Sequence, residues 1–432
     1  MSTMIRSCLV LAVLATGCMK TSATYCATHG DDLVHCPMPD APAGPSCASS
    51  SDCASTPSTG VCNTTTEMCV QCNAATSQTS ACSGTRPTCG DDDVCRGCRT
   101  HTECPSLACL PDGSCGSDAN VAFVDGTPGV TLSSACTQAA PCGKVSDALG
   151  LTPSRPFIKI TGAVDENVTI SNRDVTLIAA PGARLVKGSG TLISVAGTSN
   201  VSVFDLQIGD IVGSSVVGVD LTSSLIGTVS LHRVRVVNNS RGAIVVNGGT
   251  LSLQRSTVIE NLGGGIDVRN SATGFDIRNN FVLFNGKAIG TGTTTFGGVL
   301  IALLSGTGRL EFNTIAYNQS GDLQSVPGIA CSGSSNSATG NLVYANRRAD
   351  VVSDATQYGG NCQYGSTFKA ASGDLGFRNP DTSALDAHLT ASSPSSIRDV
   401  AGDCTAFTTT DFDGQPRPLG AACDLGADEF AP

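Results

Sequence analysis

Five segments of nine residues share one pattern: LHRVRVVNN (231–239), LQRSTVIEN (253–261), IRNNFVLFN (277–285), LEFNTIAYN (310–318) and ATGNLVYAN (338–346). Each begins with an apolar residue, carries Val or Ile at the fifth step after it, and ends in Asn at the eighth. The closing residues are Asn239, Asn261, Asn285, Asn318 and Asn346, which lie 22, 24, 33 and 28 residues apart. A self-similar unit of this length indicates a stacked-repeat architecture.

The repeated unit has the composition of a β-strand. It is rich in Val, Ile, Leu and Thr, alternates with period two as in Leu251-Ser252-Leu253, and is punctuated by Gly, Asn and Ser. One unit cannot bury its own apolar face, so neighbouring units must stack. Asn tolerates left-handed backbone geometry, and stacked Asn side chains can hydrogen-bond from coil to coil. We therefore expect the five asparagines to form a structural ladder.

Composition excludes several classes of partner. Aromatic residues make up 4% of the 432 residues and Trp is absent, which is unfavourable for a surface that stacks sugars or bases. The formal net charge is −11 and no Lys/Arg cluster is present, so neither nucleic acid nor an anionic membrane surface is an expected partner.

The N-terminus predicts export. Residues 1–17 contain Arg6 and then an apolar run that is too short to span a bilayer, which is typical of a secretory signal peptide. The following Leu14-Ala15-Thr16-Gly17-Cys18 resembles a bacterial lipobox, although Ala15 stands where Leu is usual. The resemblance implies that Cys18 is lipidated and that the protein is held at the outer membrane or cell surface. Ordinary signal cleavage is the alternative, and residues 18–46 are expected to be a tether.

Residues 47–116 form a cysteine-rich module. Its twelve cysteines fall into three units of four: Cys47, Cys53, Cys62, Cys69; Cys72, Cys82, Cys89, Cys95; and Cys98, Cys104, Cys109, Cys115. Few apolar residues lie between them, so the module needs covalent staples, and 22 cysteines in the chain indicate an oxidising compartment. The pairing is open at this stage. A zinc site at the paired Cys-x-x-Cys junctions is the alternative. The spacing loosely resembles small disulfide repeats of the EGF or dickkopf kind.

Residues 117–432 resemble the exported bacterial right-handed parallel β-helix proteins of the pectate-lyase-like group. The resemblance rests on the Asn-ended repeats, an entry with Cys136, Cys142 and a short helical stretch at 143–149, the segment at His388, and the tail from Asp411 to Phe430. It implies an all-β, right-handed parallel β-helix with an N-terminal cap at about 121–165 and a closing segment at about 366–432. His388 is then structural. The expected disulfides are Cys136 with Cys142, Cys331 with Cys362, and Cys404 with Cys423. A β-sandwich array is the alternative fold.

Catalytic chemistry on such a scaffold needs clustered acids. Glycoside hydrolysis requires two carboxylates at one sugar bond, and lyases use a base with a cation held by acids. We align Asp220, Ile244 and Asp267 in one outward column, which places the two acids about 9–10 Å apart with an apolar residue between them. Asp267 and the nearby Arg269 are thus the only catalytic candidates. The parallel column His232, Gln254, Arg278 and Glu311 is expected to be a solvated face.

Apart from the cysteine junctions, a bound metal is considered at one place. Asp411-Phe412-Asp413-Gly414 has the texture of a calcium loop, with Asp424 and Glu429 as possible neighbours, although a turn is the ordinary explanation. Ca²⁺ at Asp411 and Asp413 is the one cofactor hypothesis. The sequence favours a lipid-anchored surface protein that binds a polysaccharide or a surface protein. The expected place is residues 286–297, elsewhere between Asn285 and Asn346, or a face that the repeat leaves free. The alternative is a polysaccharide lyase or glycoside hydrolase acting on an acidic polysaccharide.

Overall fold

The computed structural model describes residues 46–54, 60–75, 82–286, 296–303, 306–321, 326–348, 356–370, 372–379 and 385–431. The predicted signal peptide, Cys18, the tether up to residue 45 and most of the 286–297 insertion lie outside the described residues. The chain divides into two compact units, Met1–Cys115 and Gly116–Pro432, which are treated separately below. No helix within the described ranges is both long and apolar enough to cross a membrane.

The first unit is held together by disulfides. Its short elements are the 3-10 helices Ser50–Cys53 and His101–Glu103 and the antiparallel pairs β1 (Val61–Asn63) with β2 (Met68–Val70) and β3 (Thr88–Cys89) with β4 (Cys95–Arg96). The bonds are Cys47–Cys62, Cys53–Cys69, Cys72–Cys89, Cys82–Cys95, Cys98–Cys109 and Cys104–Cys115. In each group of four, the first cysteine pairs with the third and the second with the fourth. All four junction cysteines are consumed, which removes the zinc alternative.

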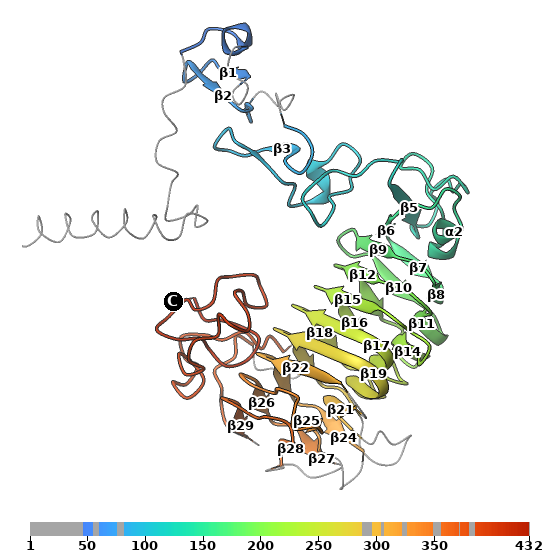
Figure 1. Cartoon of the computed structure of the whole chain (residues 1–432), viewed down its shortest axis with the longest axis vertical. Helices are drawn as coiled ribbons and strands as arrows, with labels where there is room; N and C mark the ends of the chain where they lie inside the picture. The colour runs from blue at the N-terminus through green and yellow to red at the C-terminus, as the bar shows by residue number, and fades with distance from the viewer. Residues whose placement is uncertain are drawn as a thin grey trace, which may run out of the picture. The chain divides into compact units, whose positions relative to one another are not determined.

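The second unit is a parallel β-helix with three faces (Figure 1). Face A contains β5 (Val121–Asp125), β6 (Phe157–Thr161), β9 (Val175–Ala179), β12 (Val201–Phe204), β15 (Thr228–His232), the C-terminal parts of β17 (Ile244–Gln254) and β19 (Ile266–Arg278), and β22 (Thr307–Glu311). Face B contains β7 (Ala163–Asp165), β10 (Arg184–Val186), β13 (Gln207–Gly209), β16 (Arg235–Val237), β18 (Thr257–Ile259), β20 (Phe281–Leu283), β23 (Thr314–Ala316), β26 (Leu342–Tyr344) and β29 (Phe368–Ala370). Face C contains β8 (Val168–Ser171), β11 (Ser189–Ala196), β14 (Ser215–Leu221), the N-terminal parts of β17 and β19, β21 (Val299–Leu303), β25 (Ile329–Cys331) and β28 (Tyr358–Gly360).

All neighbouring strands on the three faces pair in parallel, which confirms the predicted fold class. A further short pair, β24 (Gln319–Ser320) with β27 (Arg347–Arg348), forms a separate two-stranded parallel sheet. The apolar first step of the repeat forms a fully buried column on face A: Leu231, Leu253, Ile277, Leu310 and Ala338. The fifth step forms a second column on face B: Val236, Val258, Val282, Ile315 and Val343. Like residues therefore stack on like residues, and the repeat specifies the strand register.

The five asparagines form the predicted ladder at the bend from face B to face C. Both the backbone N–H and the Nδ2 of Asn261 donate to Oδ1 of Asn285, at 3.2 and 2.9 Å, and the same pair of bonds recurs from Asn239 to Asn346. The last step ends on Gln357 Oε1. The five asparagines do not themselves take the left-handed conformation that Asn tolerates. The positive φ belongs to the preceding residue, as at Glu260 (φ 59°) and Phe284 (φ 53°), because the bend turns the Asn side chain into the interior.

A second ladder occupies the bend from face A to face B. Asn280 donates from N and Nδ2 to Asn313 Oδ1 at 3.1 and 2.9 Å, and Asn313 does the same to Asn341. Ser256 begins this row by donating its N–H to Asn280 Oδ1. Left-handed residues again precede the ladder, including Arg255 (φ 53°) and Asn279 (φ 54°). Each short strand of face B in these coils is therefore fixed at both ends.

The first coil is covered by α2 (Val145–Leu149), as the entry sequence predicted. Val145 and Ala148 are fully buried in the main core, while the carboxylate of Glu166 accepts the N–H groups of Val145 (2.7 Å) and Ser146 (3.1 Å). An acid at this place satisfies helix N–H groups that lack an intrahelical partner. The Cys136–Cys142 disulfide lies just before the helix.

The C-terminal segment, residues 372–431, covers the outer side of face B, and its described residues form no helix or strand. One apolar cluster joins face B to this segment: Val237, Ile259, Phe281, Leu283, Ala316, Leu342 and Tyr344 with Leu375, Phe377, Ala387, Leu389, Ile397, Leu425 and Ala427. The segment thus extends along several coils instead of only closing the last one. Cys404–Cys423 lies within it, and Cys331–Cys362 links neighbouring coils.

Candidate functional site

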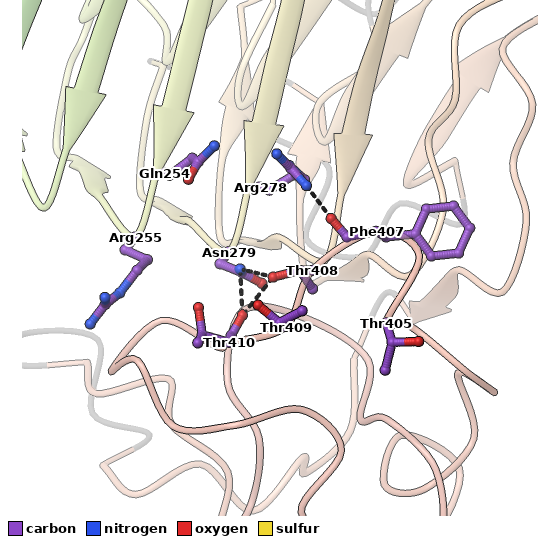
Figure 2. A pocket seen from close by; sticks show the side chains of 9 residues that line it. All are labelled: Gln254, Arg255, Arg278, Asn279, Thr405, Phe407, Thr408, Thr409 and Thr410. Atoms are coloured by element: carbon purple, nitrogen blue, oxygen red, sulfur yellow. Dashed lines mark hydrogen bonds between the residues drawn. The ribbon is translucent and has the colours of Figure 1, made fainter. Parts of the chain in front are cut away.

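The candidate site is a polar pocket of about 260 Å³ where the edge between faces A and B meets the C-terminal segment (Figure 2). We call it the edge pocket. It is lined by Gln254, Arg255, Arg278, Asn279, Thr405, Phe407, Thr408, Thr409 and Thr410. The β-helix supplies the first four of these residues and the C-terminal segment supplies the others, so the pocket exists only because the segment packs on face B.

The bend from face A to face B places the β-helix residues in the pocket. Gln254 and Arg278 are the last residues of β17 and β19 and stand opposite each other in register. Arg255 and Asn279 are the left-handed residues that follow them. At such a bend the left-handed residue projects outward, while the next residue, Ser256 or Asn280, enters the buried ladder. The same succession of a left-handed residue and a ladder residue therefore places a column of polar side chains beside the ladder.

Asn279 presents a buried acceptor that is not satisfied. The residue is 5% exposed, and its Nδ2 donates to Thr408 Oγ1 (2.8 Å) and to the Thr410 carbonyl (2.7 Å) (Figure 2). Its Oδ1 is buried and accepts no hydrogen bond within the described part of the chain. An unpaired buried polar group costs about 1–3 kcal/mol. A hydroxyl or N–H donor entering the pocket would recover that free energy.

Arg255 supplies positive charge that no acid balances by direct contact. Its Nε donates to the Phe412 carbonyl at 2.8 Å, and no ion pair to it occurs among the described residues. Burial lowers its pKa, and Arg233 lowers it further, while Asp411, Asp413 and Asp205 act in the opposite direction. Arg278, by contrast, is bound to Asp276 (Nε to Oδ1, 2.6 Å) and donates to the Phe407 carbonyl. Arg255 is therefore the side chain that an anion would meet.

The column that includes Gln254 and Arg278 continues beyond the pocket. Phe204, His232, Gln254, Arg278 and Glu311 follow one another in register. The rings of Phe204 and His232 stack with centroids 4.9 Å apart, and burial, followed by Arg233 and Arg255, lowers the pKa of His232. The prediction that this column is solvated is wrong for its last residue, Glu311. Glu311 is fully buried, and burial raises its pKa. The sequence could not show which outward positions another segment covers.

Asp267 and Arg269 lie on the outer side of face C, away from the edge pocket. Arg269 donates from Nε to Asp267 Oδ1 at 2.6 Å and from Nη2 to Oδ2, so both carboxylate oxygens are engaged. The residue between Asp220 and Asp267 is Val245, and the alignment of Ile244 at that place is wrong by one position. Residues 243–246 are all apolar, so alternation could not identify the buried ones. Burial raises the pKa of Asp220, but Asp267 is not a free partner for it.

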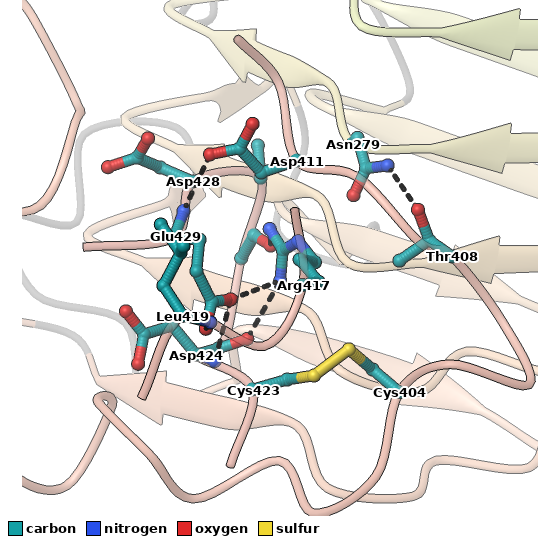
Figure 3. A network of polar contacts seen from close by, with 12 residues as sticks. Asn279, Cys404, Thr408, Asp411, Arg417, Leu419, Cys423, Asp424, Asp428 and Glu429 are labelled. Carbon is teal, nitrogen blue, oxygen red and sulfur yellow. Dashed lines mark hydrogen bonds and ion pairs between the residues drawn. A yellow bond between two sulfur atoms is a disulfide. The ribbon is translucent and has the colours of Figure 1, made fainter. Parts of the chain in front are cut away.

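The tail acids form a buried network around Asp411 (Figure 3). Asp411 accepts the N–H groups of Gln415 (2.8 Å) and Glu429 (3.2 Å), and Glu429 accepts those of Leu419 and Asp424. Arg417 has no exposed side-chain surface and pairs with Glu429 at 3.3 Å. These carboxylates hold the tail in place. Asp413 lies outside the network, with 46% of its side chain exposed.

Comparisons with known proteins give a likeness of fold. No family model matches the chain, and no curated protein matches it. Among solved structures, the chain is similar to "Crystal structure of pectate lyase Pel9A", with a TM-score of 0.38 and 12% identity over 72% of this chain and 96% of that one. At this identity the similarity carries no information on activity.

The sequence analysis did not predict the edge pocket. The pair Arg255 and Asn279, each immediately before a ladder residue, is the signal that could have found it.

Proposed function

We propose that this chain is an exported protein whose β-helix unit binds an acidic polysaccharide at the edge pocket. The observation that carries this proposal is that two groups line the same pocket. One is Arg255, a cation with no ion pair among the described residues, and the other is the unsatisfied Oδ1 of Asn279. A sugar acid offers a carboxylate to the guanidinium and hydroxyl donors to the amide oxygen. The threonines of the C-terminal segment add further hydroxyl groups at the same place.

The supporting evidence for export is the number of disulfides. Nine are present among the described residues, and disulfides persist in oxidising compartments. We further propose that acyl chains on Cys18 hold the protein at the outer membrane or cell surface. Labelled palmitate should enter the wild-type chain and not Cys18→Ala. Equal labelling of the two would contradict the anchor.

Binding is preferred to catalysis because the acids that catalysis would use are already engaged. Asp267 is held by Arg269, and Asp411 and Glu429 hold backbone N–H groups of the tail. Among the described residues, the edge pocket is lined by amide, hydroxyl and guanidinium groups and by the Phe407 ring, and by no carboxylate. Such groups can orient a polysaccharide, but none of them is an efficient general acid or base at neutral pH.

The test is calorimetric titration of the full chain with a tetrasaccharide of uronic acids and, separately, with its fully methyl-esterified form. The acid should bind and the neutral ester should bind at least tenfold more weakly. Arg255→Gln should weaken binding of the acid by roughly 10- to 100-fold, because a charged hydrogen bond is worth about 1.5–3 kcal/mol. Arg241→Gln is the matched control, since Arg241 is exposed at the other bend. Release of cleaved products would favour the lyase or hydrolase alternative.

A further inference from the structure

A cluster of one histidine and two aspartates lies in the C-terminal segment, outside the edge pocket. His388, Asp413 and Asp428 come from three separate stretches of that segment, and one potential ligand atom from each lies within 4.8 Å of the others. The Nε2 of His388 is 3.3 Å from Asp413 Oδ2. His388 has 14% of its side chain exposed and Asp428 is 4% exposed, so two members are largely removed from water.

The orientation of His388 is fixed from the other side of its ring. Nδ1 contacts Asp386 Oδ1, and a carboxylate at this position selects the tautomer that carries its proton on Nδ1. Phe281 and Phe412 pack against the ring edge-on, with centroids 5.0 and 5.6 Å from that of His388. Nε2 then carries the lone pair, with a carboxylate oxygen each of Asp413 and Asp428 close to it. This buried atom has no hydrogen-bond partner among the described residues. A cation at Nε2, either a proton or a metal ion, would complete this arrangement.

The charges around the His388 ring also favour a bound cation. Three carboxylates, those of Asp386, Asp413 and Asp428, surround one imidazole. Within the described part of the chain, Arg378 forms an ion pair with Asp386 alone, at 3.6 Å. A divalent ion would compensate this excess of negative charge.

The ligand types select the class of ion. Zinc takes imidazole nitrogen and carboxylate oxygen in four-coordinate sites, whereas calcium takes six to eight oxygens. Asp413 and Asp428 also line a hollow of about 250 Å³, together with Arg378, Thr390 and Gln415 among others. The hollow gives an ion a route to the cluster. Sites with three protein ligands leave a coordination position for water or another ligand.

We infer that His388, Asp413 and Asp428 bind a divalent ion of the zinc class, with Asp386 orienting the imidazole and an open coordination position facing the hollow. This inference does not depend on the edge pocket. The bound ion joins the three stretches at 388, 413 and 428 and so secures the C-terminal segment against Phe281 of face B. Calcium at Asp411 would be a different site, because both Asp411 oxygens accept backbone N–H groups. In Asp428, Oδ2 accepts the Leu389 N–H at 2.7 Å.

The experiment is elemental analysis and zinc titration of the full chain after treatment with EDTA and dialysis. The wild type should bind one equivalent of Zn²⁺ and melt at a higher temperature with it. Asp413→Asn and His388→Gln should each lose at least 90% of the bound zinc and the thermal shift. Asp403→Asn is the matched control, because Asp403 is exposed in the same segment and an Asn there can keep its turn with Thr405.

Folding is checked separately by near-ultraviolet circular dichroism and urea unfolding of the metal-free proteins. Asp413 is exposed, so its variant should keep the wild-type spectrum without metal. Zinc retained in full by Asp413→Asn, or no stoichiometric zinc in the wild type, would overturn the inference. A protonated His388 that titrates by NMR in the presence of equimolar zinc would overturn it as well, because the proton would then occupy the place of the ion.

Discussion

Replacing Asn285 by Ala removes the central side chain of the ladder between faces B and C. The amide accepts the N–H (3.2 Å) and Nδ2 (2.9 Å) of Asn261, and donates to the Val258 carbonyl (2.8 Å) and to Asn318 Oδ1 (3.0 Å). All of these groups are buried. At about 1 kcal/mol for each of four hydrogen bonds, the expected loss is about 4 kcal/mol in the free energy of unfolding. That is a large part of the 5–15 kcal/mol typical of a folded domain.

The assay is equilibrium unfolding in urea, followed by circular dichroism, with the dependence on denaturant fitted for each variant. Asn167→Ala is the matched control. Asn167 is exposed and donates one hydrogen bond, to the Ser189 carbonyl at 3.1 Å, so its loss should cost less than about 1 kcal/mol. If Asn285→Ala also costs less than about 1 kcal/mol, the ladder is not the stabilising element described above.

Two further predictions concern burial and the cysteine-rich unit. Burial raises the pKa of Glu311, so the folded protein binds a proton more tightly than the unfolded chain and loses stability as pH rises through the folded pKa. Glu311→Gln should therefore leave stability at pH 4 unchanged and increase it at pH 7.5 in urea unfolding, and an unchanged pH profile would contradict the assignment. Replacing Cys72 and Cys89 together by Ser opens a 17-residue span and should cost about 3 kcal/mol in the first unit. Faster proteolysis within residues 72–95 measures this loss, and cleavage at the wild-type rate would count against it.

The repeat could be predicted because its physical cause is local. Leu253, Val258 and Asn261 each take their role from one coil and recur at the same offsets in the next, so a single sequence contains the register several times over. The members of the second ladder, Ser256, Asn280, Asn313 and Asn341, also recur at one offset, three residues after the first residue in four of the five segments. The offset alone does not show that they form a ladder. Its meaning depends on the left-handed residue before each member, which varies from Arg255 to Phe312.

The candidate sites could not be predicted for a different reason. The edge pocket joins Asn279 to Thr408 and Thr410, and the proposed metal site joins His388 to Asp413 and Asp428, so each needs contacts between stretches distant in sequence. The alignment of residues 243–246 failed because four consecutive apolar residues carry no alternation. Periodicity specifies a coil, but it contains no information on where an irregular tail lies against the coils.

The measurement that tests the central claim most directly is the affinity of the full chain for the uronic-acid tetrasaccharide, compared between wild type, Arg255→Gln and Arg241→Gln. The account predicts that Arg255→Gln weakens binding by roughly 10- to 100-fold, as one lost charged hydrogen bond requires. It predicts that Arg241→Gln stays within about twofold of the wild type, because Arg241 lines no part of the pocket. Equal affinities for all three proteins, or an equal loss in both variants, would contradict a specific acidic-polysaccharide site at the edge pocket.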